Sequence, residues 1–231
     1  MKKSIIALLL FWGIVAFANA KETYFKFSVN SISELKKLTK IISIDNVKEK
    51  TVYAYANERE FKIFSELGYS YQILPNPSTL TKAKMANSPQ QMRNWDFYPT
   101  YETYVSMMYQ FEEDYPDLCE IENIGTTVNG RELLFAKISD NVHSNEDEPE
   151  FMYTATMHGD ELVGYVLMLR LIDYLLSNYE TNSQVANLVN NLEIWINPLA
   201  NPDGTFAAGN NTVNGATRYN GNNIDLNRNF P

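Results

Sequence analysis

Cysteine and histidine are scarce in this chain. Of its 231 residues only one is a cysteine, Cys119, and two are histidines. A single cysteine cannot form an internal disulfide, so the fold must be stabilised by its hydrophobic core or by a metal. Apolar residues make up 45% of the chain and charged residues 20%, with no internal repeat and no low-complexity tract. That composition is typical of a globular protein of one or two domains.

An excess of positive charge is also missing. The formal net charge is −9, which argues against nucleic acid or an anionic membrane as a partner. The densest acidic run, residues 146–150, could hold calcium, but a solvated loop is the favoured interpretation.

The only long hydrophobic run lies at the N-terminus. Two lysines precede the apolar residues 4–17, and Ala18-Asn19-Ala20 follows them, which predicts a secretory signal peptide over residues 1–20. A transmembrane anchor is less favoured, because the run is shorter than the ~20 residues that span a bilayer. We therefore expect a secreted or periplasmic protein that has no membrane partner once the signal is removed.

Residues 21–75 have the pattern of a small α+β module of the ferredoxin-like type. Ser31 with Glu34 forms a capping-box pattern, Asn57 can cap a second helix, and Gly68 can end it. The expected strands and helices follow a βαββαβ order: strands over 23–29, 41–44, 51–56 and 69–74, and helices over 31–39 and 57–67.

A stretch rich in proline, lysine and polar residues, 76–94, is predicted to be an exposed linker. A small module on an exposed linker suits a propeptide that is later cut away, because flexible segments are favoured sites of proteolysis. A permanent accessory domain is the alternative.

Strands and helices are expected to alternate in residues 95–231, which predicts an α/β layered domain. Asn129-Gly130 marks a hairpin turn between two of the strands. The expected elements are helices over 103–115 and 162–179, and strands over 121–127, 132–138, 151–157 and 192–196.

His158 and Glu161 lie at the junction between a predicted strand and a predicted helix. Residues three apart share one face of a helical turn, so an imidazole nitrogen and a carboxylate could converge on a metal ion. The spacing alone is a weak signal. The alternative is an ordinary helix start, in which Asp160 and Glu161 favour the positive end of the helix dipole.

Polar residues cluster again downstream, in 197–204 and 222–230. The planar guanidinium of Arg228 and the amide of Asn227 are suited to binding the C-terminal carboxylate of a peptide. A second arginine, Arg218, could meet a developing oxyanion. Taken singly, each residue could equally be a surface ion pair, a turn residue or a solvated charge.

Together these residues resemble the zinc carboxypeptidases of the carboxypeptidase A and B type. The resemblance covers roughly residues 95–231, and the preceding module resembles the propeptide of that family. The motifs that carry it are Tyr98-Pro99-Thr100-Tyr101, Ile124-Gly125 with Asn129-Gly130-Arg131, His158-Gly159-Asp160-Glu161, Asn201-Pro202-Asp203-Gly204 and Asp225-Leu226-Asn227-Arg228-Asn229-Phe230.

The resemblance implies a mixed twisted sheet with helices on both faces, and one Zn²⁺ ion. By it, His158 and Glu161 are zinc ligands, while Asn227 and Arg228 bind the terminal carboxylate of a peptide or protein substrate. Arg218 is implied to polarise the scissile carbonyl and to stabilise the oxyanion.

The chain departs from the family in two respects. The family's third zinc ligand, a histidine, and its general base, a glutamate, both lie further downstream than Pro231, and the other histidine here, His143, precedes His158. We therefore expect this chain to be the front part of a longer enzyme and to be inactive by itself. Residues 21–231 expressed alone are expected to be poorly soluble, because strands that cover apolar faces in the family would be missing.

The favoured function is a secreted zinc metallocarboxypeptidase that removes C-terminal residues from peptides. Two alternatives remain open at this stage. One is a non-catalytic peptide-binding remnant of the same fold, and the other is a related zinc amidase.

Overall fold

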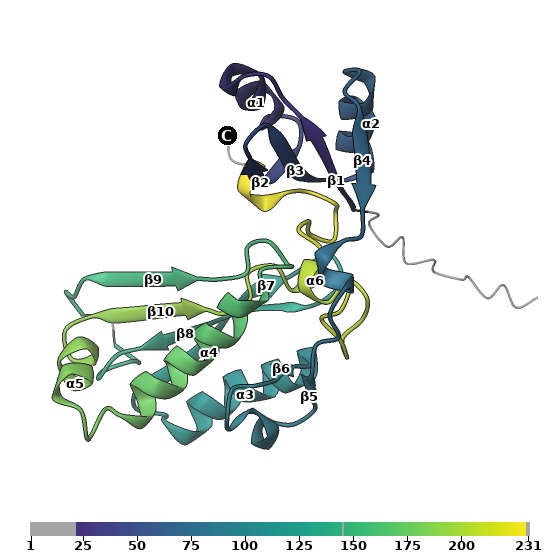
Figure 1. The fold of residues 1–231 in the computed structure, drawn as a ribbon. Helices are drawn as coiled ribbons and strands as arrows, with labels where there is room; N and C mark the ends of the chain where they lie inside the picture. Colours follow the sequence, from purple (N-terminus) through teal and green to yellow (C-terminus); the bar gives the residue numbers. More distant parts are fainter. Residues whose placement is uncertain (1–21, 145, 230–231) are drawn as a thin grey trace, which may run out of the picture.

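Two sheet-containing bodies follow one another along the chain (Figure 1). The computed structural model describes residues 22–144 and 146–229. The predicted signal peptide, residues 1–20, lies outside the described residues. Among the residues that are described, no helix is long and apolar enough to cross a membrane.

The N-terminal module has the predicted βαββαβ order. Its sheet is antiparallel with the strand order β2-β3-β1-β4. Asn57 caps the second helix in a full capping box with Glu60, and Gly68 ends that helix with a φ of 78°. The elements are β1 (Thr23–Ser28), α1 (Ile32–Leu38), β2 (Ser43–Lys48), β3 (Thr51–Ala56), α2 (Glu58–Glu66) and β4 (Tyr71–Leu74).

The module has a hydrophobic core of its own. Phe25 and Phe64 are fully buried with ring centroids 4.7 Å apart, and Phe61 packs edge-on against Phe25. This aromatic cluster joins α2 to the sheet, and it is separate from the core of the second body.

The predicted linker, residues 76–94, is exposed over much of its length but contains short elements and two buried side chains. Pro77–Thr79 (η1) is followed by Met85–Ala86 (β5), which pairs in parallel with Tyr98–Pro99 (β6), and then by Pro89–Met92 (η2). Ala86 and Met92 are buried in the core of the second body. The predicted linker is therefore attached to the larger domain by these two apolar side chains, while most of the residues around them stay exposed.

The larger body is a mixed α/β domain, which confirms the predicted fold class. Its sheet has the order β7-β8-β10-β9, in which β9 and β10 are parallel and the other pairs are antiparallel. The elements are α3 (Tyr101–Asp114), β7 (Cys119–Thr126), β8 (Glu132–Ile138), β9 (Glu150–Thr154), α4 (Leu162–Ser177), α5 (Ser183–Val189), β10 (Glu193–Asn197), α6 (Pro202–Thr205) and η3 (Leu226–Arg228).

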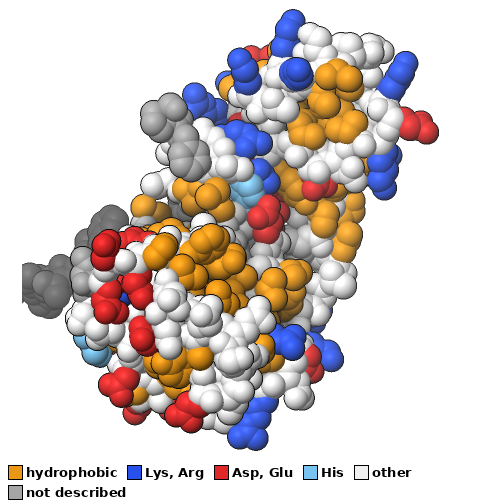
Figure 2. Space-filling view, turned by 90° about the vertical axis from the view of Figure 1, so that its left-hand side faces the viewer, with side chains coloured by type: hydrophobic (Ala, Val, Ile, Leu, Met, Phe, Trp, Pro, Cys, Tyr) orange, Lys and Arg blue, Asp and Glu red, His pale blue; other side chains and the backbone are white. Residues whose placement is uncertain are grey.

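Helices α3 and α4 lie along one face of this sheet (Figure 1). Leu134 and Ile138 of β8 and Ile196 of β10 are fully buried and belong to the same hydrophobic cluster as Tyr104 and Leu169 of the two helices. By contrast, the edge strand β9 is exposed along its whole length, and Phe151 is 49% exposed. Hydrophobic side chains are visible over much of this body's surface in Figure 2.

The parallel pairing of β9 and β10 brings two loops to the same edge of the sheet. β9 ends at Thr154, three residues before the end of the predicted strand, and the loop that follows carries His158. β10 ends at Asn197, beside Thr154, and leads into α6. The carboxyl ends of neighbouring parallel strands are the usual place for a binding site in a sheet of this kind.

Candidate active site

The loop after β9 places His158 and Glu161 against each other. His158 Nδ1 lies 2.7 Å from Glu161 Oε1. His158 is 6% exposed, whereas the side chain of Glu161 is 59% exposed. Glu161 occupies the N-cap position of α4 but makes no capping hydrogen bond through its side chain. The structure therefore turns Glu161 towards His158 and not towards the free amides of the helix.

Asp225 holds the opposite edge of the imidazole. His158 Nε2 lies 3.2 Å from Asp225 Oδ1, and Arg218 Nε donates to Asp225 Oδ2 at 2.9 Å. The backbone N–H of Asn227 also donates to this carboxylate, at 3.0 Å. Asp225 is 4% exposed, so a buried carboxylate links the histidine to the arginine.

The pKa values of these groups follow from their contacts. Burial raises the pKa of the Asp225 carboxyl, but hydrogen bonds from His158, Ser43 and Arg218 outweigh it, and the pKa is held well below its usual range. Burial likewise lowers the pKa of His158, but the hydrogen bonds with Asp225 and Glu161 outweigh it, and the pKa is raised. The two carboxylates therefore favour a protonated ring, in which Nε2–H faces Asp225 and Nδ1–H faces Glu161.

A metal ion suits this donor pair. Without a metal, a protonated Nδ1 can donate to Glu161 Oε1 across this 2.7 Å, and a metal ion can take the place of that proton between the two atoms. A ligating histidine usually donates its other ring N–H to a carboxylate, and Asp225 occupies that place. Glu161 is exposed enough to adjust to an ion. His158 and Glu161 thus fit a metal as two of its ligands.

Arg218 reaches the same cluster from the loop after α6. Its side chain is 12% exposed and is paired with Asp225. Its backbone carbonyl accepts from Gly159 N at 3.4 Å, next to His158 in the sequence, and from Asn201 Nδ2 at 3.3 Å. Two of the predicted site residues, His158 and Arg218, therefore contact the Asp225 carboxylate, and a third, Glu161, joins them through His158.

Asn227 and Arg228 lie close to this cluster in sequence, but their side chains do not join it. Both residues are exposed in η3, and within the described part of the chain the Arg228 side chain donates only to the backbone carbonyl of Asn227, from Nη1 at 3.0 Å. The side chains of Asn227 and Arg228 are accessible to a ligand, but they do not hydrogen-bond to His158, Glu161 or Asp225.

The N-terminal module covers the same cluster. Ser43 Oγ donates to Asp225 Oδ2 at 2.6 Å, and Glu22 Oε1 accepts from Arg218 N at 2.9 Å. Burial, followed by the charge of Asp160, raises the pKa of Glu22 to about 7. Tyr219 OH also donates to Glu60 of the module. The module and the site therefore share a buried polar interface.

Two other features lie apart from this cluster. His143 is largely exposed and contacts the carbonyl of Pro116 at 3.0 Å. Asp140, Glu146 and Glu148 place carboxylate oxygens within 4.8 Å of one another, but Asp140 and Glu146 are exposed, as expected for a solvated acidic loop. Neither feature contributes a group to the His158 cluster.

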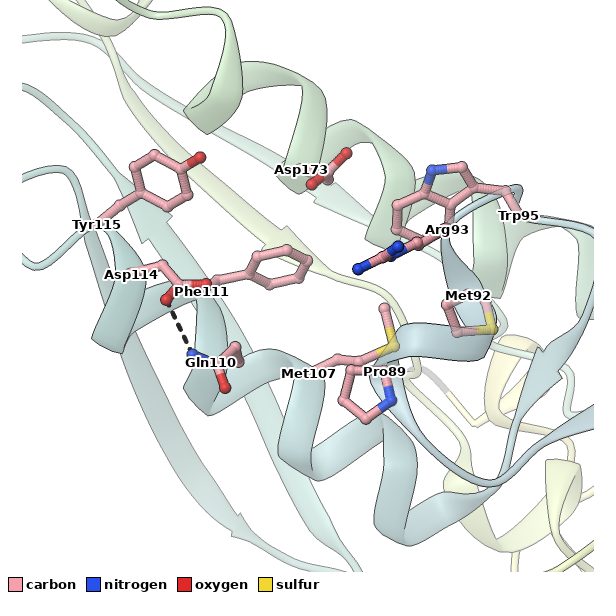
Figure 3. Close-up of a pocket in the computed structure, with 10 residues that line it drawn as sticks. All are labelled: Pro89, Met92, Arg93, Trp95, Met107, Gln110, Phe111, Asp114, Tyr115 and Asp173. Atoms are coloured by element: carbon pink, nitrogen blue, oxygen red, sulfur yellow. Dashed lines mark hydrogen bonds between the residues drawn. The ribbon is translucent and has the colours of Figure 1, made fainter.

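A pocket of about 340 Å³ opens between η2, α3 and α4 (Figure 3). Phe111, Met107 and Trp95 form apolar walls, and Asp173 lies at its α4 side. Asp173 lies eleven residues beyond the start of α4, which is roughly 16 Å along the helix axis. The pocket is therefore distinct from the cluster around His158.

Sequence reasoning assigned no role to Asp225, although this residue lies at the centre of the cluster. An acidic residue among apolar and amide side chains, three positions before Arg228, was the available signal. Asp203 and Arg131 were also missed. They form a buried ion pair at 2.8 Å, which joins the hairpin turn to α6.

Known proteins resemble this chain most clearly in its larger domain. A family model described as zinc carboxypeptidase matches residues 104–231. Human carboxypeptidase D is 43% identical over 124 residues, which are 53% of this chain and 9% of that protein. A zinc carboxypeptidase from Saccharothrix mutabilis subsp. capreolus is 37% identical over 107 residues, which are 46% of this chain and 25% of that protein.

The fold has relatives among solved structures. The crystal structure of carboxypeptidase A from Helicoverpa armigera superposes with a TM-score of 0.64 at 21% identity, covering 93% of this chain and 58% of that one. The chain thus spans less than two thirds of the length of each of these relatives. Since the family model matches more than half of the residues, the chain belongs to the zinc carboxypeptidase family.

Proposed function

We propose that this chain belongs to a secreted or periplasmic zinc carboxypeptidase that hydrolyses the C-terminal peptide bond of peptides. The observation that carries the proposal is the 2.7 Å approach of His158 Nδ1 to Glu161 Oε1, with Nε2 held by the buried Asp225. A buried histidine oriented by a carboxylate and facing a second carboxylate is a metal-ligand arrangement.

His158 and Glu161 would hold one zinc ion. Zinc in such a site acts as a Lewis acid and lowers the pKa of a bound water to ~7. The family resemblance implies a third ligand, a histidine, and a general base, a glutamate, in addition to these two residues.

Asp225 would orient the histidine and restrain Arg218. The carboxylate accepts from His158 Nε2 and from Arg218 Nε, so both side chains are fixed by one group. The guanidinium keeps further N–H groups that could donate to a carbonyl oxygen as negative charge develops on it. Fixing donors before the reaction removes the cost of arranging them during it.

Asn227 and Arg228 would bind the free carboxylate of the substrate. Both side chains are exposed, and a guanidinium can bind a carboxylate through two parallel hydrogen bonds. This role favours an exopeptidase over an amidase, which has no need of a free C-terminus.

Residues 21–75 would act as an inhibitory propeptide. Support comes from Ser43, which donates to Asp225, and from Glu22, which accepts from Arg218. Lys82 is exposed in the first part of the linker, where a protease specific for basic residues could cut. The expected signal peptide, residues 1–20, would direct export.

The test is a zinc titration of the chain without its signal peptide, by competition with a chelating dye. The variants His158→Ala and Glu161→Gln are titrated in the same way. We expect both substitutions to weaken binding by at least tenfold. In the full-length protein, a peptide with a free C-terminus should be cleaved, and the same peptide with a C-terminal amide should not. Zinc binding that is unchanged in both variants would refute the proposed site.

A further inference from the structure

Helix α6 joins the two loops of the candidate site. Thr205 Oγ1 donates to the carbonyl of Gly159 at 2.8 Å, which ties α6 to the turn that carries His158. Thr217 N donates to the carbonyl of Gly204 at 2.9 Å, which ties α6 to the loop that carries Arg218. A four-residue helix therefore sets where these two loops meet.

The contacts around α6 leave no room for adjustment. A methyl group on Gly159 would lie 2.2 Å from the backbone carbon of Gly204. One on Gly204 would lie 2.5 Å from the carbonyl oxygen of Tyr219. Backbone packs directly on backbone at both places, so a small shift of α6 must move the His158 turn or the Arg218 loop.

The position of α6 depends in turn on the hairpin between β7 and β8. Asp203 of α6 is 3% exposed and accepts from Arg131 Nη1 and from Thr127 Oγ1, each at 2.8 Å. The guanidinium of Arg131 also donates to the carbonyl of Phe206 and to Asn210 Oδ1. Arg131 therefore contacts α6 and also the segment that follows it.

These contacts are directional. A buried ion pair is weak support for stability, because removing its charges from water costs about as much as their attraction returns. A guanidinium that makes hydrogen bonds at fixed angles to three acceptors nevertheless determines orientation. The hairpin that carries it is an antiparallel ladder with an irregularity between Asn123 and Thr126, and its turn at Gly130, φ 77°, is held by Thr127 N donating to the carbonyl of Arg131 at 2.8 Å.

We propose that Arg131 and Asp203 are positioning residues for the site: through α6 they set the placement of the His158 turn against the Arg218 loop, and hence the affinity for metal. This inference rests on the proposed function, since it concerns the same pair of loops. Neither residue touches metal or substrate in this arrangement.

The test compares two buried ion pairs of the same domain. Arg131→Met and Asp203→Asn break the proposed support, and Lys137→Met and Glu193→Gln break a matched pair. Lys137 and Glu193 lie 3.2 Å apart with 10% and 4% side-chain exposure, against 11% and 2% for Arg131 and Asp203. Glu193 begins β10 and lies four residues, about 13 Å, from the site end of that strand.

Zinc affinity is measured for each folded variant by competition with a chelating dye. We expect Arg131→Met and Asp203→Asn to bind about tenfold more weakly than the unsubstituted chain, and the Lys137 and Glu193 variants to bind as it does. Arg131→Lys keeps the positive charge but loses the planar guanidinium with its several donors. Its zinc affinity should therefore lie between those of the unsubstituted chain and Arg131→Met. Asp203→Asn preserves the shape of the side chain and serves if Arg131→Met does not fold.

The ¹⁵N chemical shifts of the His158 ring, measured by NMR without metal, provide a second test. They should move in the Arg131 and Asp203 variants and stay in place in the Lys137 and Glu193 variants. Equal losses of affinity from both pairs, or none from either, would overturn the inference. Failure of the proposed metal site is recognised separately, because His158→Ala would then leave the zinc affinity of the unsubstituted chain unchanged.

Discussion

The N-terminal module and the larger domain bury their apolar residues to different extents. The module closes a complete core within about fifty residues, where Phe25 and Phe64 are fully buried. The larger domain has the bigger core but leaves strand β9 exposed along one edge. Burial is therefore completed locally in the module, whereas the larger sheet still presents an apolar edge.

The strongest test of whether the two cores are independent removes a core side chain from one body and follows the hydrogen exchange of both bodies. Phe25→Ala should destabilise the module by about 3–5 kcal/mol, because it deletes a fully buried aromatic ring. Hydrogen exchange should then accelerate in residues 23–74, while the amides of β8 and β10 stay protected. Leu169→Ala, in the other core, should give the reverse pattern. Simultaneous loss of protection in both bodies would mean that they unfold as one unit.

The interface between the bodies should weaken as the pH rises. The pKa of Glu22 is raised to about 7 by burial and by Asp160, so the docked module holds this proton more tightly than the free one. Docking is then strongest below about pH 4.5 and declines as the pH approaches 7. Glu22→Gln should remove this dependence and strengthen docking at pH 8 by up to about 3 kcal/mol.

That prediction is checked by hydrogen exchange of β2 at pH 5 and pH 8, corrected for the intrinsic rates. The exposed Glu66→Gln is the control and should behave as the unsubstituted chain does. If the Glu22→Gln variant had the same pH dependence as the unsubstituted chain, Glu22 would not be the group that weakens docking as the pH rises.

A smaller effect is expected from the hydroxyl that joins the module to the site. Ser43→Ala removes the 2.6 Å hydrogen bond to Asp225 and should weaken docking by about 1.5 kcal/mol, the lower end for bonds to a charged group. After protease cleavage near Lys82, size-exclusion chromatography would measure the fraction of the N-terminal module that dissociates from the larger domain. Ser65→Ala, whose hydroxyl bonds only within α2, should retain the module as before.

The smallest change in stability is expected at the exposed edge. Phe151→Lys on β9 should alter the free energy of unfolding by no more than about 0.5 kcal/mol, because the side chain is half exposed. It should nevertheless reduce self-association, since a charge on an edge strand opposes pairing with another chain. Sedimentation velocity tests this, with Phe151→Leu as the control. Equal association of both variants would show that β9 is not the contact surface.

Much of the local structure could be predicted because it depends on neighbours in sequence. Alternating apolar residues, Asn57 as a cap and Asn129-Gly130 as a turn act within a few residues, and the corresponding elements are present. The strand predicted to reach residue 157 ends at Thr154, because Thr156 adopts a left-handed conformation with a φ of 58°. The burial of Ala86 and Met92 was missed because their partners come from distant segments.

The sequence by itself determined which residues could do chemistry here, because side-chain type and short spacing are local properties. It predicted His158, Glu161 and Arg218 as site residues, with Asn227 and Arg228 as the carboxylate-binding pair. Only the tertiary structure decided that Asp225 joins the histidine to the arginine, and that Ser43 reaches the same carboxylate across 182 residues of sequence. Such contacts depend on how the strands and loops pack, and no local pattern encodes that.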